Sequence, residues 1–405
     1  MSIQVSPYNR QGWEESQNSR RIFFCDVTAR DGEQTVGVAF TVEEKVELAR
    51  RLVAQGVRQL QYAAVKSSED AMRVAKTVCG LGLDADIEIM TFINTPDWRD
   101  QVLAAIDCGA DIVHALIPVS LQTRGFYDPL DDEATVDRAL QYISFARSNG
   151  AKQVNLNMLD CPRAEEPFFD KLVTACVNEG IDRMRINDTV GTATPESIHY
   201  LVGKAKGIIH ELGKKTIIGV HCHDDFGFAV SNTVAGVRAG ADFVDVAVNG
   251  LGERAGNADI TQVAGALQLL YGVDCGLRSL EGLYALSRYV AEISGISVAS
   301  NRPLVGDFVF SDQSDKHNAA FALNPHAFQG ILPQMVGNRR RVMIGKKTGP
   351  YTLDLKLEEM GLILPEEKKE VVLQAVKKAA SSFRGQPLPD TECEAIIINH
   401  GGRKK

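Results

Sequence analysis

The chain has 405 residues, and 52 acidic side chains against 44 lysines and arginines give a formal net charge of -8. Hydrophobic residues at 44% and charged residues at 24% are typical of a globular protein and exclude a disordered or collagen-like chain. Because the chain is acidic, has no long basic run and has no apolar stretch near the roughly 20 residues that span a bilayer, we expect neither a nucleic acid nor a membrane as a partner.

The eight cysteines lie far apart, without a Cys-x-x-Cys pair and without a secretory signal before them. Several are in apolar runs, where a cysteine behaves as a small core side chain. We therefore predict reduced thiols in a cytoplasmic protein.

A repeated pattern of strand and helix begins after residues 1–20, which are polar and are interpreted as an N-terminal arm. Short β-rich runs alternate with helical patterns about eight times, as in parallel βαβ units. No Gly-x-Gly-x-x-Gly motif follows the first strand, which favours a closed (β/α)₈ barrel over residues 21–275 rather than an open doubly wound sheet. The predicted strands span residues 21–28, 57–63, 85–92, 111–117, 153–158, 183–188, 216–221 and 242–248.

The alternation stops after residue 275. An amphipathic helix is predicted for residues 280–294, then a turn-rich stretch over 301–349 and helices near 355–360 and 365–383. We interpret residues 276–405 as a mainly helical accessory region that serves as a lid and in dimerisation. One helical face suits either a subunit interface or the core of its own subunit. This face consists of Leu280, Leu283, Leu286 and Val290.

Ionisable residues after the predicted strands are candidates for an active site, because catalytic groups of such barrels gather at the carboxyl ends of the strands. His221 and His223 are two residues apart on an extended segment, so both rings point to one side and can bind one cation. Taken alone, the pair is more simply explained as two polar residues at a strand end. Asp31 after the first strand and Asn257 after the eighth add oxygen ligands, and this set suits Zn²⁺, Mn²⁺ or Mg²⁺.

Two further strand-end residues are candidates for binding substrate. Arg30, next to a predicted metal ligand, is a candidate to hold a substrate carbonyl oxygen that gains negative charge. The alternative is that Arg30 forms an ion pair with a carboxylate of the barrel rim. Thr189, after the sixth strand, is able to bind a substrate carboxylate through its hydroxyl group, and the alternative is a hydroxyl that stabilises the turn.

Four segments at these strand ends resemble the signature segments of the homocitrate synthase and 2-isopropylmalate synthase family, within the DRE-TIM metallolyases. They are ARDGEQT at 29–35, DTVGTATP at 188–195, HCHDDFGFAVSN at 221–232 and NGLGERAGNA at 249–258. The resemblance continues past the barrel through LVGDFVFSDQSDKHNAAF, MVGNRRRVMIGKKTG and LKLEEMGLILPEEKKE, so it covers nearly the whole chain. It implies a divalent-metal enzyme that condenses acetyl-CoA or another acyl-CoA with a 2-oxo acid in a Claisen-type reaction and then hydrolyses the thioester.

The same resemblance implies a role for individual residues. The implied metal ligands are Asp31, His221, His223 and, more weakly, Asn257. The implied substrate contacts are Arg30, Gln34 and Thr189. His317, beyond the barrel, takes the position of the catalytic histidine. The resembling enzymes are dimers in which the post-barrel segment of one subunit covers the barrel mouth of the other, so we expect a homodimer with a composite active site.

The chain also departs from the family pattern. Leu159 stands where the family usually has a glutamate, and Phe328 stands where a catalytic tyrosine is expected. Without these two groups, either the substrates differ from the familiar ones or other groups transfer the protons. The remaining departures are Gln61 for a strand glutamate, Asp224 for the asparagine after His-x-His, and Asp312 for a histidine in the post-barrel segment.

Near the fourth strand, Leu116, Pro118 and Phe126 predict an apolar wall. Lys66 and Arg124 are candidates to bind a second substrate carboxylate or a CoA phosphate, and the alternative for each is a solvated surface charge. The family's leucine-responsive regulatory domain is not expected, because the chain ends about where the accessory helices end.

Three hypotheses for the function remain. The first is the Claisen-type synthase that forms a branched 2-hydroxy acid. The second is a metal-dependent lyase or aldolase that breaks the same kind of carbon–carbon bond, and the resemblance after the barrel favours the synthase over it. The third is a non-catalytic paralogue that keeps the metal site, which the missing glutamate and tyrosine support.

Overall fold

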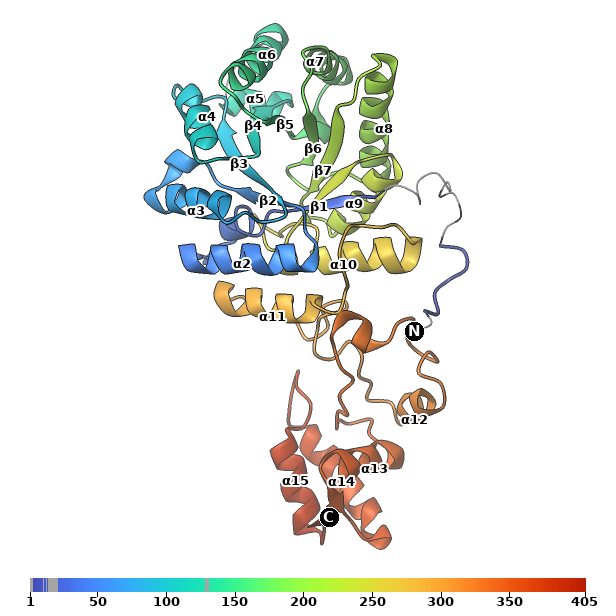
Figure 1. Cartoon of the computed structure of the whole chain (residues 1–405). Helices are drawn as coiled ribbons and strands as arrows, with labels where there is room; N and C mark the ends of the chain where they lie inside the picture. The colour runs from blue at the N-terminus through green and yellow to red at the C-terminus, as the bar shows by residue number, and fades with distance from the viewer. Residues whose placement is uncertain (1–2, 10, 12, 14–20, 128–130) are drawn as a thin grey trace. The chain divides into compact units, whose positions relative to one another are not determined.

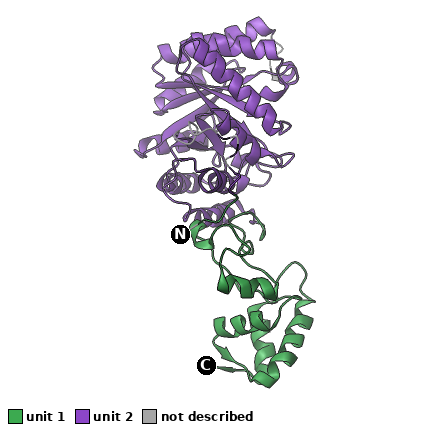
Figure 2. Ribbon diagram, turned by 90° about the vertical axis from the view of Figure 1, so that its right-hand side faces the viewer, with its two compact units in different colours: residues 1–6, 299–405 green, residues 7–298 purple. Residues whose placement is uncertain are grey.

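The computed structural model describes residues 3–9, 11, 13, 21–127 and 131–405. The chain forms two compact units (Figure 2). The larger comprises residues 7–298, and the smaller comprises residues 1–6 with 299–405. Each unit is described by itself below.

In the larger unit, eight parallel strands close into a barrel in chain order (Figure 1). β8 pairs with β1. Their bounds are β1 (Phe23–Asp26), β2 (Gln59–Tyr62), β3 (Asp86–Phe92), β4 (Ile112–Pro118), β5 (Gln153–Leu159), β6 (Arg183–Asp188), β7 (Ile217–Cys222) and β8 (Phe243–Val246). Each of the eight predicted strands overlaps one of these. The predicted (β/α)₈ barrel is therefore confirmed.

Helices surround the barrel, and the local signals that predict them are present in the structure. The Thr41 side chain accepts a hydrogen bond from the backbone of Glu44, and Glu44 accepts one from the backbone of Thr41, which forms a capping box. The helices of this unit are α2 (Val42–Gln55), α3 (Glu69–Gly80), α4 (Trp98–Asp107), α5 (Leu121–Tyr127), α6 (Asp132–Ser148), α7 (Glu166–Asn178), α8 (Pro195–Glu211), α9 (Ala229–Arg238), α10 (Ile260–Gly265) and α11 (Leu283–Ser294). Short helical turns are η1 (Gly32–Gln34), η2 (Val65–Ser67), η3 (Cys161–Arg163), η4 (Val248–Gly250) and η5 (Ala266–Tyr271).

The apolar face of α11 packs within its own chain. Leu283 and Val290 are almost fully buried, and the helix lies against α2 and η4. Ser287 fixes this packing, because its hydroxyl donates to Asn249 Oδ1 at 2.5 Å and its carbonyl accepts from Asn249 Nδ2 at 2.9 Å. This face therefore belongs to the core of its own subunit, and its interpretation as a subunit interface is wrong.

The smaller unit is mainly helical and has its own hydrophobic core. Its elements are α12 (Asp315–Leu323), η6 (Pro333–Val336), α13 (Pro350–Glu359), β9 (Leu362–Ile363), η7 (Glu366–Lys368), α14 (Lys369–Ala380), α15 (Asp390–Asn399) and β10 (Arg403–Lys404). The core is formed mainly by Leu353, Leu357, Val372, Leu373, Val376 and Ile397. α12 lies in a stretch predicted to be turn-rich, and it has only a weak apolar pattern because Asn318 and Phe321 are its buried residues.

Within the described part of the chain, no helix has the length and apolar character needed to cross a bilayer. All eight cysteines belong to that part and are free thiols.

Candidate active site

The structure brings four predicted metal ligands together at the carboxyl end of the barrel. His221 is in β7, His223 follows it, Asp31 follows β1, and Asn257 forms an isolated bridge with His223. The two Nε2 atoms lie 3.1 Å apart, and Asp31 Oδ2 lies 3.5 Å from that of His221 and 3.9 Å from that of His223. The ligand atoms of the three ionisable residues all lie within 4.8 Å of one another.

Partners on the other ring nitrogen orient both histidines. His221 Nδ1 donates to Asp245 Oδ2 at 2.9 Å, and His223 Nδ1 donates to the carbonyl of Gly256 at 3.1 Å. Each ring therefore directs its Nε2 lone pair toward the other ring and toward Asp31. A ligand histidine held in this way by an outer acceptor is the usual arrangement in metal sites.

Asn257 gives an independent test of whether a cation fits. Its side chain is buried, its Nδ2 donates to Leu251 O at 2.9 Å, and its Oδ1 has no hydrogen-bond partner. A buried carbonyl oxygen without a donor is uncommon, and a divalent cation would satisfy it. Two imidazoles, a carboxylate and an amide oxygen form a donor set that fits such an ion.

The charge states of the cluster also suit a cation. Burial alone would raise the pKa of Asp31, but the charge of the neighbouring Arg30 holds it below its ordinary range, so the carboxylate is ionised. Burial, and then the neighbouring His221, lower the pKa of His223 to about 4, so its ring is neutral at neutral pH. Ionised carboxylate and neutral imidazole are the forms that bind metals.

Arg30 adjoins this cluster. Its Nη1 donates to Asp31 Oδ2 at 2.8 Å and to Gln34 Oε1 at 3.2 Å, and its Nε donates to Gln61 Oε1 at 2.6 Å. Gln34 in turn donates to Glu253 Oε1 at 2.9 Å. The guanidinium is therefore held in a fixed orientation beside the predicted metal ligands.

A cavity of about 590 Å³ opens from this cluster. Arg30, Gln34 and Thr189 all line it, next to Asp31 and the two histidines. The Thr189 hydroxyl accepts a hydrogen bond from the backbone of Asp160 at 2.9 Å, which leaves its proton available to a ligand. The rest of the lining is Met90, Phe92, Ile93, Asn94, Thr95, Leu116, Pro118, Thr123, Phe126, Asn157, Leu159, Asn187, Glu253 and Arg254.

Neither predicted carboxylate anchor lines the cavity. Lys66 is exposed and pairs with Asp100 at 3.3 Å, as a surface charge does. Arg124 is buried, pairs with Asp132 and lies with its guanidinium carbon 4.2 Å from the centre of the Phe168 ring. For Arg124, the solvated surface charge is wrong, because the side chain is buried, and its role as an anchor for a carboxylate or a CoA phosphate stays a prediction.

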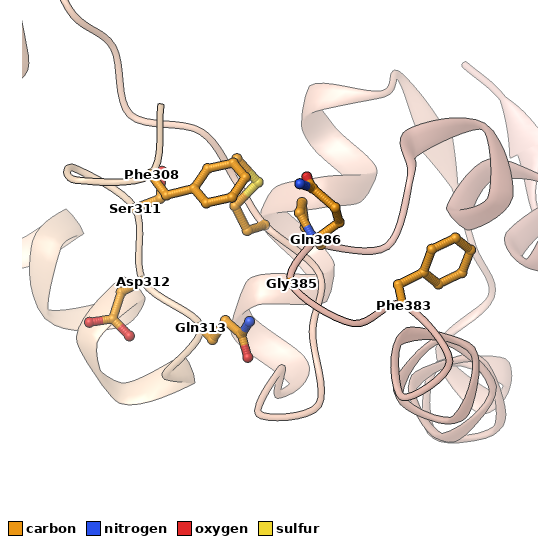
Figure 3. Close-up of a pocket in the computed structure, with 9 residues that line it drawn as sticks. Phe308, Ser311, Asp312, Gln313, Phe383, Gly385 and Gln386 are labelled. Carbon is orange, nitrogen blue, oxygen red and sulfur yellow. The ribbon is translucent and has the colours of Figure 1, made fainter. Parts of the chain in front are cut away.

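His317 lies in the smaller unit, where Asp312 orients it. Its Nδ1 lies 2.7 Å from Asp312 Oδ2, and the ring stacks on Phe328 with 3.9 Å between the centroids. Figure 3 shows a neighbouring pocket of about 240 Å³ in the same unit, with Asp312 and Gln313 on one side and Phe383 on the other. Two of the departures from the family pattern, at positions 312 and 328, thus contact the predicted catalytic histidine.

A buried polar network inside the barrel was missed by sequence analysis. Glu88 accepts hydrogen bonds from His114 and Asn155, both at 2.6 Å, and pairs with Arg185 at 2.9 Å. Arg185 also lies 3.1 Å from Asp245, which orients His221. The only available signal is the presence of charged residues inside otherwise apolar strands.

Comparison with models of known protein families shows which family the chain belongs to. The model of the HMGL-like family matches residues 21–290, and the model described as "Homocitrate synthase post-HMGL domain-like" matches residues 304–383. The chain belongs to the HMGL-like family. The second match extends the assignment to the smaller unit, so both units have counterparts in known proteins.

Relatives of this HMGL-like chain include three kinds of synthase. Homocitrate synthase AksA of Methanopyrus kandleri is 36% identical over 97% of this chain and 96% of its own length. A putative (R)-citramalate synthase of the same organism is 36% identical over 95% of this chain and 73% of its own length. The 2-isopropylmalate synthase of Methanocaldococcus jannaschii is 33% identical over 95% of this chain and 72% of its own length. These relatives confirm the predicted family and the predicted kind of enzyme.

Solved structures show the same fold. Hydroxymethylglutaryl-CoA lyase from Pseudomonas aeruginosa has a TM-score of 0.58 at 18% identity and covers 69% of this chain and 95% of its own. The lyase from Brucella melitensis has a TM-score of 0.55 at 18% identity, over 68% of this chain and 100% of its own.

Proposed function

We propose that the chain condenses an acyl-CoA with a 2-oxo acid to give a branched 2-hydroxy acid and free CoA. The observation that carries this proposal is the cluster of Asp31, His221 and His223 beside Arg30 at the cavity, with the unpaired Asn257 oxygen next to it. Such a site suits a reaction in which a keto oxygen gains negative charge.

Asp31, His221, His223 and Asn257 would hold one divalent ion, for which Mn²⁺, Zn²⁺ and Mg²⁺ are the candidates. When bound, this ion supplies Lewis-acid polarisation of a carbonyl group. Arg30 holds the keto oxygen as it becomes an alkoxide. Gln34 and Thr189 orient the substrate carboxylate through their amide and hydroxyl groups.

The bond-forming step removes a proton from the α-carbon of the acyl-CoA. The resulting carbon nucleophile attacks the keto carbon, and the alkoxide takes up a proton. Water then cleaves the thioester, which releases a carboxylate and the CoA thiol. His317 is the proposed base, because Asp312 holds its Nδ1 at 2.7 Å and leaves Nε2 to accept the proton.

We propose a cytoplasmic homodimer in which His317 of one subunit serves the barrel of the other. The support is that His317 and the predicted metal ligands belong to different compact units. Mixing inactive His317→Ala protein with inactive His221→Ala protein, under conditions of subunit exchange, is expected to restore part of the activity. No recovery despite demonstrated exchange would contradict the shared site.

Thiol release tests the reaction itself. Purified metal-loaded protein is incubated with acetyl-CoA or longer acyl-CoAs and a panel of 2-oxo acids, and free CoA is measured with a thiol reagent. Release that requires both substrates supports the synthase. A lyase would instead cleave the branched hydroxy acid, and a non-catalytic paralogue would bind metal without either reaction.

A further inference from the structure

The part of the cavity away from the metal ligands is formed by β3, β4 and β5 and by residues that follow β3 and β4, among them Asn94, Thr95, Thr123 and Phe126. In the strand register, Phe92 pairs with Leu116, and Leu116 pairs with Asn157. Pro118 pairs with Leu159 at the next inward-facing position. Side chains two residues apart on a strand point to the same side, so these residues form one continuous surface inside the barrel mouth.

This surface, here called the distal wall, is mainly apolar. Its apolar members are Met90, Phe92, Ile93, Leu116, Pro118 and Leu159. Asn157 and Asn187 add neutral amides. Asn187 pairs in register with His221, so the distal wall continues directly into the metal ligands.

The cations of the cavity are at its other end and are already engaged. Arg30 contacts Asp31, Gln34 and Gln61. Arg254 pairs with Asp225 at 2.9 Å and with Glu253 at 3.1 Å, and it donates to the carbonyl of Thr189 at 2.6 Å. Among the described residues that line the cavity, none on the distal wall carries a positive charge.

A substrate that places its keto and carboxylate groups at Arg30 and Thr189 directs its side chain at the distal wall. A second carboxylate there would lose water without gaining a cation, and burying an unpaired charge is very unfavourable. An apolar side chain would instead gain from contact with Leu116 and Leu159.

We propose that the distal wall selects a 2-oxo acid with a bulky, uncharged, apolar side chain, and that Leu116 and Leu159 determine this specificity. The inference rests on the proposed function, because it concerns the same site. It also gives Leu159 a role, since this side chain contributes apolar surface where the family pattern has a carboxylate.

A pair of substrates of matched shape tests the proposal. The acid 5-methyl-2-oxohexanoate differs from 2-oxoglutarate only by an isopropyl group in place of the distal carboxylate. With the acyl-CoA fixed, kcat/KM from thiol release is expected to be about 100-fold or more higher for the methyl acid. Equal or better use of 2-oxoglutarate would overturn the proposal.

Binding separates this inference from the proposed reaction. Calorimetric titration of the metal-loaded protein with each acid, without acyl-CoA, is expected to show tighter binding of the methyl acid. If no pair of substrates releases thiol, the synthase proposal fails, and the titration still decides the specificity of the wall. Tighter binding of 2-oxoglutarate would refute the wall's selectivity whatever the reaction.

A charge added to the wall provides the reverse test. Leu116→Arg is expected to shift the ratio of kcat/KM toward 2-oxoglutarate by about 10-fold or more. Leu103→Arg, the same change on the exposed part of α4, is the matched control and should leave the ratio unchanged. An unaltered ratio in a folded, metal-binding Leu116→Arg protein would contradict the role of this residue. If that variant does not fold, the wild-type comparison of the two acids decides the question.

Discussion

Gly252 offers a test of the metal centre in which no ligand is replaced. A Cβ atom added at Gly252 would lie 2.1 Å from Asn257 Nδ2 and 2.9 Å from Asp31 Oδ1. Gly252→Ala must therefore move the Asn257 amide by about 1 Å or more to restore an ordinary van der Waals separation. That movement disrupts the hydrogen bond of 2.9 Å from Asn257 Nδ2 to Leu251 O. The amide oxygen then leaves the position that suits a cation.

We expect Gly252→Ala to weaken metal binding by about 10–100-fold, or about 1.4–2.8 kcal/mol, the usual effect of disturbing the groups that hold a ligand. Calorimetric titration with Mn²⁺ and Zn²⁺ at one pH measures this, and circular dichroism checks the fold. Gly203→Ala is the control, because a Cβ at this position of α8 meets no atom within 4 Å. Metal affinity unchanged from wild type in folded Gly252→Ala protein would refute the reasoning.

Three further predictions concern neighbouring groups. The Arg30→Lys protein should still bind metal but lose about 10²–10³-fold in kcat, because a point charge does not reproduce the planar contacts of Arg30. Near-normal turnover would show that Arg30 only forms an ion pair at the barrel rim. Asp245→Asn should weaken metal binding by about 10–100-fold, because Asp245 orients the ligand His221. It should also lower the melting temperature, because it removes a counter-ion of buried Arg185. Wild-type values of both metal affinity and melting temperature would contradict this prediction. Burial raises the pKa of Asp26 to about 7, so the folded chain binds the Asp26 proton more tightly than the unfolded chain does. The free energy of unfolding should therefore fall as pH rises from about 4 to about 7. Urea midpoints at pH 5 and pH 8 should differ less in Asp26→Asn than in wild type, and an equal difference would argue against the shift.

The barrel was predictable because its sequence signals are local and repeated. Buried parallel strands are short apolar runs, and helix starts such as Thr41 and Thr194 have side-chain caps that are present in the structure. α12 and α15 carry weaker signals. In α15 the residues Cys393 and Ile397 are buried while Ile398 is exposed, so no clear apolar stripe marks the helix.

The metal cluster was predictable for a topological reason. A closed parallel barrel brings all strand ends to one rim, so Asp31 and His221 meet although 190 positions of sequence separate them. Arg124 shows the limit of this rule. It follows β4 like a rim residue, but Asp132 and Phe168 lie on α6 and α7, and no sequence pattern links those positions.

The buried network was not predictable, because its partners depend on register. Arg185 contacts Glu88 at 2.9 Å and Asp245 at 3.1 Å across the barrel, from strands that are far apart in sequence. Burial alone would raise the pKa of Glu88, but the charge of Arg185 and the hydrogen bond from His114 hold it below its usual range. All of these groups are ionised or polar in a place where apolar side chains would pack with less desolvation cost. Asp245 gives a reason for their presence, since Arg185 lies 3.1 Å from the carboxylate that accepts the hydrogen bond from His221 Nδ1. The same arginine neutralises Glu88, so the orientation of one metal ligand and the charge balance of the barrel interior depend on a single side chain.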